Sequence, residues 1–219
     1  MNGRLIAIGD IHGYNKSLQT LLGAIEPTPD DVIVTLGDYV DRGPDSKGVI
    51  DTLIRWGRKT QLVPLLGNHE EMMLNVVRGD EPHHAWLRYG GIDTLESYNF
   101  DGDLNFLPPE HLQFFDSLGD YFVHGEFFFT HAAYDPGLEM DQQPAELLRW
   151  HSLRAGIPDP HFSGRTAVVG HTANHEAEIL DIGHLICLDT NCYGGGLLTA
   201  MELPSKHVWQ STPEGVLVR

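Results

Sequence analysis

Hydrophobic residues occur along this chain in two patterns, short apolar runs and stretches with a helical period. Short apolar runs bounded by glycine, proline or charged residues predict buried strands, whereas apolar residues recurring every three or four positions predict amphipathic helices. The predicted strands cover residues 5–8, 32–36, 61–66, 127–130, 166–169, 178–182, 185–188, 197–203 and a last stretch around Val216. The predicted helices cover residues 14–25, 47–58, 70–78, 85–98 and 109–117.

The order of these elements predicts an α/β fold with mixed sheets. Strands alternate with helices at the start of the chain, which is typical of parallel βαβ units, whereas the late strands follow one another so closely that we expect antiparallel pairing. Residues 135–164 are rich in proline and are predicted to form mainly a surface loop with one helical turn. We find no internal repeat and no long linker, and we expect residues 1–219 to form a single domain.

The composition narrows the range of partners and compartments. The 14 basic and 31 acidic residues give a formal net charge of −17, and such an acidic surface repels nucleic acid. No apolar run is long enough for a membrane span, and the first predicted strand begins at residue 5, which leaves no room for a signal segment. Cys187 and Cys192 form no disulfide framework. We therefore expect a cytoplasmic protein with neither a nucleic-acid partner nor a membrane partner.

Polar side chains with metal-binding or proton-transfer chemistry follow five of the predicted strands. In chain order they lie in Gly-Asp-Ile-His-Gly at 9–13, Gly-Asp-Tyr-Val-Asp-Arg-Gly at 37–43, Gly-Asn-His-Glu at 67–70, at His131, and in Gly-His-Thr at 170–172. Ligands of open α/β sheets bind outside the carboxyl ends of the strands, so we expect these segments to converge on one site. Asp10 and His12 are two residues apart and point to the same side of an extended backbone, so they can reach one cation together.

The donor atoms of these segments indicate a metal centre. Carboxylate, amide and imidazole groups without a thiolate suit Mn, Fe or Zn better than Ca or a structural zinc site. Six candidate ligands exceed what one ion with an open position needs, so two ions that share a bridging carboxylate fit better. The candidate metal ligands are Asp10, His12, Asp38, Asn68, His131 and His171.

Each segment alone also has an ordinary structural explanation. Asp10 could cap the helix predicted to follow it, and Asp41 with Arg42 could form a loop ion pair of little energetic value. Asn68 could simply begin a helix, and a lone histidine such as His131 is more often a satisfied core residue than a ligand. Their joint occurrence at five strand ends favours a functional site.

The three long motifs in this order, followed by a lone histidine and Gly-His-Thr, resemble the signature of the phosphoprotein phosphatase family of metallophosphoesterases. The resemblance extends over about residues 5–200. It implies that Asp10 and His12 bind a first metal ion and that Asp38 bridges two ions. The ligands that it implies for the second ion are Asn68, His131 and His171.

The same resemblance implies the remaining roles at the site. His69 corresponds to the general acid, with Asp41 as its partner, and Arg42 corresponds to a clamp on the phosphate. A second arginine usually completes this clamp, and the Leu-Arg-Trp element at 148–150 resembles the corresponding helix end of bacterial members. The predicted substrate-binding residues are therefore Arg42, Asn68 and Arg149, with Arg154 as the rival of Arg149.

The resemblance also implies a fold and an activity. We expect two mixed β-sheets packed as a central sandwich and flanked by helices, which makes four layers. The expected reaction is hydrolysis of a phosphomonoester by a hydroxide that bridges two divalent ions, with Mn as the first choice and Fe, Zn or Mg as alternatives. The leading hypothesis is a serine/threonine protein phosphatase that acts on a phosphoprotein or on a small phosphomonoester.

Two other functions stay open on the sequence alone. Symmetrical dinucleoside-polyphosphate hydrolases are related, but they tend to have Gly-Asn-His-Asp in the third motif and no aspartate before the arginine of the second, whereas this chain has Glu70 and Asp41. A catalytically silent binding module of the same fold is disfavoured because the ligand set, His69 and Arg42 are all retained. Residues 191–192, Asn-Cys, depart from the glycine that many relatives have after Asp-Thr.

Overall fold

Two five-stranded sheets form the centre of the computed structural model, which describes residues 3–219. The first sheet has the order β10-β9-β1-β2-β3 and consists of β1 Leu5–Ile8, β2 Val32–Thr35, β3 Gln61–Pro64, β9 Leu198–Leu203 and β10 Val208–Ser211. The second has the order β4-β5-β6-β8-β7 and consists of β4 Tyr121–His124, β5 Phe127–Thr130, β6 Thr166–Val169, β7 Leu180–Asp181 and β8 Leu185–Cys187.

Both sheets are mixed, which confirms the prediction. β1, β2 and β3 run parallel, and β9 pairs antiparallel with β1 and with β10. In the second sheet β5, β6 and β8 run parallel, whereas the edge strands β4 and β7 are antiparallel to their neighbours. Parallel strands end at the same edge of a sheet, so each sheet gathers the carboxyl ends of its three parallel strands.

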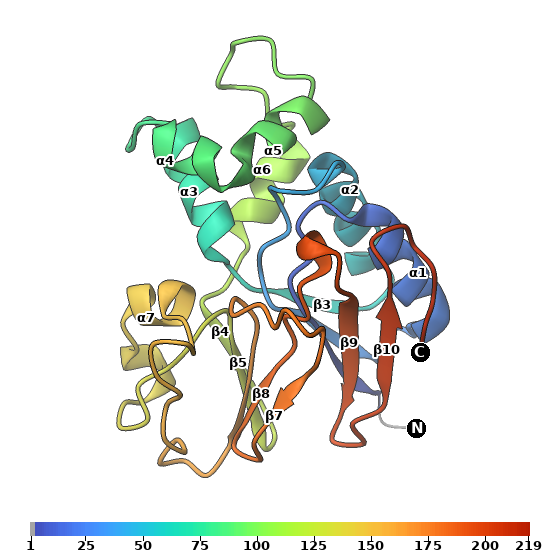
Figure 1. The fold of residues 1–219 in the computed structure, drawn as a ribbon, viewed down its shortest axis with the longest axis vertical. Helices are drawn as coiled ribbons and strands as arrows, with labels where there is room; N and C mark the ends of the chain where they lie inside the picture. The colour runs from blue at the N-terminus through green and yellow to red at the C-terminus, as the bar shows by residue number, and fades with distance from the viewer. Residues whose placement is uncertain (1–2) are drawn as a thin grey trace.

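Helices cover the first sheet and extend beyond the ends of its strands (Figure 1). Their bounds are α1 Asn15–Ile25, α2 Ser46–Gly57, α3 Asn68–Arg78, α4 His84–Trp86, the π-helical segment Leu87–Gly91, α5 Ile92–Ser97, α6 Pro109–Asp116 and α7 Ala145–Trp150. α1 and α2 pack against one face of the first sheet, and α7 lies beside the second sheet. No helix described between residues 3 and 219 has both the length and the apolar character needed to cross a bilayer.

Local sequence explains where several helices begin. The Asp45 carboxylate accepts the N–H of Gly48 at 3.0 Å and caps α2. At the start of α3, the Glu70 carboxylate accepts the N–H of Gly67 at 3.2 Å, as the acidic residue of a capping box does. Pro109 begins α6, where its missing N–H and its fixed φ are tolerated.

Alternation along the strands separates the hydrophobic residues into layers. Leu5 and Ala7 of β1 pack between the two sheets, whereas Ile6 and Ile8 pack against the helices. The layer between the sheets also contains Val34, Leu36, Phe129, Val168, Ile186 and Met201. The two sheets thus pack face to face, and the predicted sandwich is confirmed.

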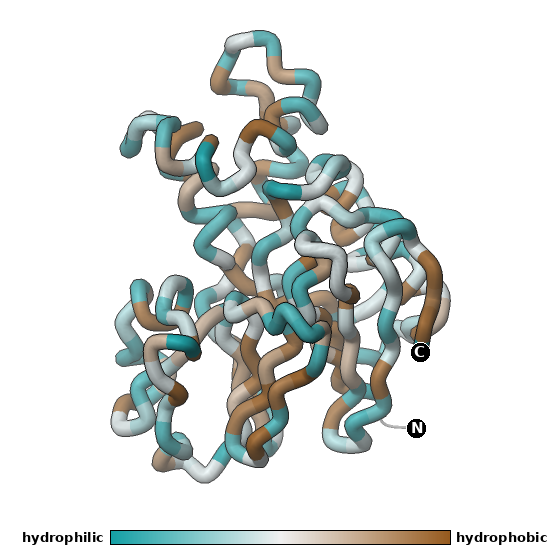
Figure 2. The backbone as a smooth tube through the Cα atoms, viewed as in Figure 1, coloured by the Kyte–Doolittle hydropathy of each residue, from teal (hydrophilic) through white to brown (hydrophobic). Residues whose placement is uncertain are grey.

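The outer face of the second sheet is covered mainly by the long segment between β5 and β6. Phe128 of β5 packs there against Tyr134 and Leu153. The segment contains a 3-10 turn at Met140–Gln142 and the short helix α7, and is otherwise irregular, so the loop predicted for residues 135–164 is confirmed in outline. Figure 2 shows hydrophobic residues concentrated in the strands and hydrophilic residues along the loops.

The continuous helix predicted for residues 85–98 is interrupted. α4 ends at Trp86, the π-helical segment Leu87–Gly91 follows, and α5 begins at Ile92. The reason is Gly90, whose φ of 107° lies outside the helical region. A hydrophobic period continues across such a kink, so the sequence pattern alone did not reveal it.

Two predictions about strands were also wrong. No strand forms around Val216; the last strand is instead Val208–Ser211, and Leu217 makes only an isolated bridge to Ser211. The edge strand Tyr121–His124 was not predicted, although its first three residues form a short apolar run; in the structure most of its side chains are exposed, and it pairs antiparallel with β5.

Candidate metal centre and active site

Five strand ends from the two sheets meet at one place. The residues that follow these strands are Asp10 and His12 (β1), Asp38 (β2), Asn68 (β3), His131 (β5) and His171 (β6). His131 Nδ1 donates to the carbonyl of Leu36 at 2.7 Å, which joins the second sheet to the first. The Asp10 carboxylate accepts the N–H of His171 at 3.0 and 3.1 Å, which makes a second connection. The structure therefore brings the predicted ligands together where the two sheets meet.

The loop after β2 has a strained backbone. Asp38, Asp41 and Arg42 have φ angles of 52°, 71° and 69°, in the left-handed region that L-residues rarely adopt. Buried Glu70 holds this loop, because its carboxylate accepts the N–H groups of Asp38 and of the next two residues at 2.7–3.1 Å. Strain of this kind persists only where the surroundings enforce it, and it clusters at functional sites.

Asp38 lies between two groups of potential metal ligands. One group contains His12 and His69, the other contains His131 and His171, and in each the ligand atoms lie within 4.8 Å of one another. Asp38 Oδ2 is 3.4 Å from His12 Nε2, and Oδ1 is 3.4 Å from His131 Nε2. Burial alone would raise the pKa of Asp38, but the surrounding imidazoles hold it well below its usual range. Asp38 thus presents one carboxylate oxygen to each group.

Three acceptor atoms face one another in the second group. His131 Nε2 is 3.0 Å from Asn68 Oδ1 and 3.2 Å from His171 Nδ1, and His171 Nδ1 is 3.0 Å from Asn68 Oδ1. The opposite ring nitrogens donate to backbone carbonyls, His131 Nδ1 to Leu36 and His171 Nε2 to Trp150. In a neutral imidazole the facing nitrogens therefore carry lone pairs.

Facing lone pairs of this kind fit a divalent cation. Burial lowers the pKa of His131 and lowers that of His171 to about 4, so both rings are neutral near pH 7. Two ring nitrogens and an amide oxygen repel one another unless a positive charge lies between them, and this nitrogen and oxygen set suits a first-row transition metal. The residues present fit a metal ion on their own geometry.

His12 has the same arrangement on the other side of Asp38. Its Nδ1 donates to the carbonyl of Val40 at 3.0 Å, so its Nε2 faces the centre as an acceptor. Arg42 Nη1 donates to this nitrogen at 3.0 Å, and the Arg42 guanidinium lies 4.1 Å from the centre of the Tyr193 ring. A planar cation with several donors is thereby held beside the centre, where it can bind phosphate oxygens.

Asp10 lies at the edge of the centre and belongs to neither ligand group. Burial and the neighbouring Asp189 carboxylate raise the pKa of Asp10 well above its usual range, and burial raises that of Asp189 to about 6. A cation is the natural partner of two buried carboxylates placed side by side, because it removes their mutual repulsion. Asp10 therefore also fits a metal ion.

His69 forms a buried pair with Asp41. His69 Nδ1 is 2.7 Å from Asp41 Oδ2, so the carboxylate accepts the Nδ1 proton and His69 Nε2 faces Asp38 Oδ2 at 4.0 Å. Trp86 Nε1 donates to both Asp41 oxygens at 3.0 Å, and Thr94 Oγ1 donates to one of them at 2.7 Å. A carboxylate fixed by these two donors orients the imidazole, as a proton-transfer histidine requires.

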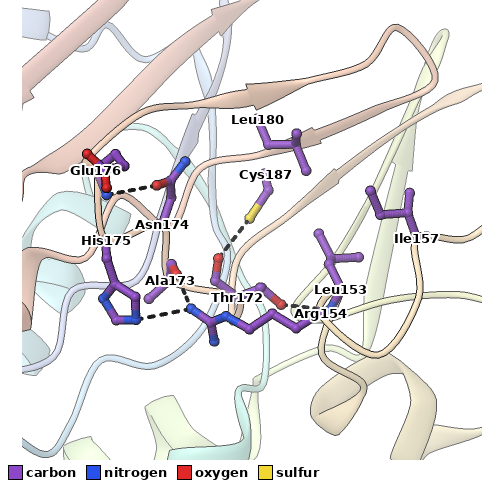
Figure 3. A pocket seen from close by; sticks show the side chains of 10 residues that line it. All are labelled: Leu153, Arg154, Ile157, Thr172, Ala173, Asn174, His175, Glu176, Leu180 and Cys187. Carbon is purple, nitrogen blue, oxygen red and sulfur yellow. Dashed lines mark hydrogen bonds between the residues drawn. The ribbon is translucent and has the colours of Figure 1, made fainter.

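Arg149 and Arg154, the two candidates for the second arginine that binds the phosphate, both contact other groups in the structure. Arg149 pairs with Glu71 at 2.5 Å and with Asp120 at 2.5 Å. Arg154 donates to the carbonyl of Ala173 and lines a cavity of about 390 Å³ with His175 (Figure 3). Direct contacts thus connect every predicted site residue except Arg149, whose role as the second clamp stays a prediction.

Several residues that support the site were not identified from the sequence. In the sequence, Glu70 only distinguished the third motif from Gly-Asn-His-Asp, whereas in the structure its carboxylate holds the loop that carries Asp38. Trp86 and Thr94 fall within the predicted helix 85–98, and periodicity does not distinguish an indole that donates to a carboxylate from one that fills a core. A buried Asp41 carboxylate needs hydrogen-bond donors, but the sequence does not show which residues supply them.

The backbone conformation explains why asparagine can stand at residue 191, where many relatives have glycine. Asn191 has a φ of 61°, a left-handed conformation that glycine adopts freely and that asparagine tolerates better than most residues. The substitution therefore keeps the turn that carries Tyr193 to the side of His12, where the two rings meet edge-on at 5.0 Å.

Residues 3–195 match the sequence profile of the calcineurin-like phosphoesterase family. The match covers most of the chain, so this protein belongs to the calcineurin-like phosphoesterases, a family of metal-dependent phosphoesterases.

Curated relatives of two kinds are similar to this chain. Serine/threonine-protein phosphatase 1 of Salmonella typhimurium is 38% identical over 85 residues, a segment that spans 38% of this chain and 37% of that protein. The symmetrical bis(5'-nucleosyl)-tetraphosphatase of Methylobacillus flagellatus is 27% identical over 266 aligned positions, which cover 93% of both chains.

Solved structures agree with the fold. A structure provisionally assigned as a diadenosine tetraphosphatase has 25% sequence identity and a TM-score of 0.71, covering 96% of this chain and 94% of its own. A cold-active protein tyrosine phosphatase has a TM-score of 0.74 at 16% identity, with 100% of this chain and 78% of its own covered, and shows the shared fold alone.

Proposed function

We propose that residues 1–219 form one catalytic domain with a dinuclear metal centre that hydrolyses phosphomonoesters, and that phosphorylated serine or threonine residues of proteins are its leading substrates. The observation that carries this proposal is the position of Asp38, which directs one carboxylate oxygen toward each of two groups of imidazoles. One such residue between two ligand sets is what a bridging ligand requires.

The ligands are assigned from this arrangement together with the sequence motifs. Asp10 and His12 would hold one divalent ion, Asp38 both ions, and Mn is the first choice, with Fe, Zn or Mg as alternatives. The second ion would be held by Asn68, His131 and His171 in addition to Asp38. When bound, two such ions lower the pKa of a water molecule and neutralise charge on the phosphate.

The remaining side chains supply orientation and a proton. Arg42 presents a planar set of donors to the phosphate, because its guanidinium donates to His12 Nε2 and stacks on the Tyr193 ring. His69 donates a proton from Nε2 to the leaving oxygen, while Asp41 accepts the Nδ1 proton and orients the ring. His69 also stands close to His12 and Asp38, so a role as a metal ligand is the alternative that experiment must exclude.

The substrate has two candidates with separate support. Glu70 and Asp41 match the phosphoprotein phosphatase motifs, and the Salmonella relative carries a serine/threonine phosphatase name. The full-length match to a symmetrical tetraphosphatase and the similarity to a structure provisionally assigned that activity support dinucleoside-polyphosphate hydrolysis.

The test is metal removal followed by a comparison of substrates. We expect a chelator to abolish hydrolysis of p-nitrophenyl phosphate and Mn to restore it, and metal analysis to give two ions per chain. Parallel kcat/KM values on phosphothreonine peptides and on diadenosine tetraphosphate decide between the two candidates. Full turnover in chelator would refute the dinuclear mechanism.

A further inference from the structure

A groove of about 470 Å³ lies next to the candidate active site, between α3, the π-helical segment and α7. We name it the Tyr89–Trp150 groove after the two aromatic residues in its walls. None of the predicted metal ligands lines it. It is therefore adjacent to the metal centre but separate from it.

Both walls of this groove are attached to the site. The ring of Tyr89 meets the ring of His69 edge-on, with centroids 6.4 Å apart. On the other wall, the carbonyl of Trp150 accepts a hydrogen bond from His171 Nε2 at 3.1 Å. The proposed general acid protonates the leaving oxygen, so the leaving group must lie on the side of His69, which is where this groove begins.

The aromatic side chains of the groove are unusually exposed. Tyr89 is 53% exposed and Trp150 is 38% exposed. The backbone beside Tyr89 is nevertheless fixed, because the carbonyl of the next residue, Gly90, accepts the N–H of Arg42 at 3.2 Å. The Trp150 ring is held by its Nε1, which donates to Glu71 at 2.6 Å. Rigid exposed aromatics beside a reaction centre are typical of surfaces that contact a ligand, because they bury a large area at small entropic expense.

The charge of the groove restricts what can occupy it. Glu71 is neutralised by Arg149, but Glu81 and Glu146 form no ion pair among residues 3–219, and no lysine or arginine lines the groove. A nucleotide leaving group carries several negative charges and would be repelled here. A polypeptide with basic residues near the phosphorylated side chain would be attracted.

We propose that the Tyr89–Trp150 groove binds the leaving-group side of the substrate and selects phosphopeptides with basic residues beside the phosphorylated residue. This rests on the proposed function, since it uses His69 as the proton donor. Tyr89 and Trp150 contact the peptide chain, and Glu81 and Glu146 pair with its basic side chains.

The experiment compares a phosphothreonine peptide that has two arginines before the phosphorylated residue with the same peptide carrying two glutamines. Two ion pairs at the edge of a groove correspond to about a tenfold preference in kcat/KM for the arginine peptide. We expect the double variant Glu81→Gln/Glu146→Gln to lose this preference. The control Glu139→Gln/Glu178→Gln removes two exposed carboxylates outside the groove and should keep it. Tyr89→Ala should raise KM for both peptides about fivefold, and Tyr89→Phe should restore it.

Equal turnover of the two peptides by the unmodified enzyme would overturn the proposal, as would a preference that survives in the groove variant. Diadenosine tetraphosphate turned over faster than either peptide would also overturn it. Failure to hydrolyse p-nitrophenyl phosphate with Mn present would instead reject the proposed function itself, so the two failures are distinguishable.

Discussion

At the scale of single residues, the site depends on which atom of each ring carries a proton. Backbone carbonyls of Leu36, Val40 and Trp150 accept from one ring nitrogen of His131, His12 and His171, which leaves the other nitrogen free to bind a cation. His69 differs because its outer nitrogen faces the carboxylate of Asp41 rather than a carbonyl. The group that accepts from Nδ1 or Nε2 on the side away from the centre, a carboxylate for His69 and a backbone carbonyl for the others, thus separates the proposed proton donor from the proposed ligands.

Replacing His69 by asparagine tests this separation. We expect kcat to fall at least about a hundredfold, as for the loss of a general acid, with metal content unchanged. Metal analysis and steady-state kinetics on the same preparation give both quantities. Loss of a metal ion in His69→Asn would show instead that His69 is a ligand, in the group that it shares with His12 and Asp38.

A substitution of Trp86 tests how far the orientation of His69 depends on the residue that holds Asp41. Trp86→Phe removes the N–H that donates to both oxygens of buried Asp41, and a buried acceptor that loses its donor destabilises by about 1–3 kcal/mol. We expect kcat to fall about tenfold while KM stays constant, because the imidazole is less well held but the substrate contacts remain. Urea unfolding measures the stability, and Trp56→Phe, a half-buried tryptophan elsewhere, is the matched control that should retain kcat.

At the scale of elements, the loops after the strands are as important as the strands themselves. Leu36 ends an apolar run, and within six residues the backbone passes through three non-glycine positions with positive φ. Such a loop survives because Glu70, from the start of α3, accepts three of its N–H groups. The helix that begins with Asn68 and His69 therefore also holds the loop that carries Asp38.

A substitution of Gly37 tests how closely the loop after β2 approaches His131 and Gly67. It has a φ of 102°, and a Cβ at this position would lie 2.7 Å from His131 Nδ1 and 2.8 Å from the N of Gly67. We expect Gly37→Ala to lower the free energy of unfolding by more than about 3 kcal/mol and to reduce metal content, because the clash adds to the backbone strain. The control is Gly102→Ala, with a φ of 107° and nothing within 4 Å, which should cost only the strain of about 1–2 kcal/mol. Equal losses in urea unfolding would contradict the packing argument.

Prediction from sequence succeeded for elements with a strong local pattern. Leu5–Ile8 and Phe127–Thr130 are short apolar runs, and their bounds agree with the structure. The pattern failed at Tyr121–His124, where exposed residues pair only because β5 lies beside them, and at Gly90, where one φ angle divides a periodic segment. Edge pairing and kinks depend on neighbours in space, which a local pattern does not contain.

At the scale of the whole molecule, the chain must hold its first strand in the centre of a sheet. β1 lies between β9 and β2, and Arg4 just before it pairs with buried Asp31 at 2.7 Å and also donates to the carbonyl of Ile25 at 3.1 Å. This ion pair connects the start of the chain to the end of α1 and the start of β2. Burial alone would raise the pKa of Asp31, but hydrogen bonds from Arg4 and Thr28 hold it well below its usual range.

The low pKa of Asp31 predicts a pH dependence of stability. A carboxyl group with a lowered folded-state pKa contributes stability that is fully present above its unfolded pKa of about 4 and that is lost as the pH falls through the folded value. We expect Asp31→Asn to cost about 1–2 kcal/mol at pH 7 and progressively less below pH 4, as measured by urea unfolding at each pH. The control Asp116→Asn breaks the exposed pair with Arg78 and should cost at most about 0.5 kcal/mol. A constant cost of Asp31→Asn down to pH 2 would contradict the assignment.

The sequence by itself determined the residue types at five strand ends, and with them the class of chemistry, because motif order and donor type are local properties. Only the tertiary structure decided which atoms face one another. The packing of two sheets placed His131 and His171 against Asn68, directed both oxygens of Asp38, and gave Arg149 the partners Glu71 and Asp120. Distances between segments far apart in the chain follow from the packing of the whole molecule, and no local pattern carries that information.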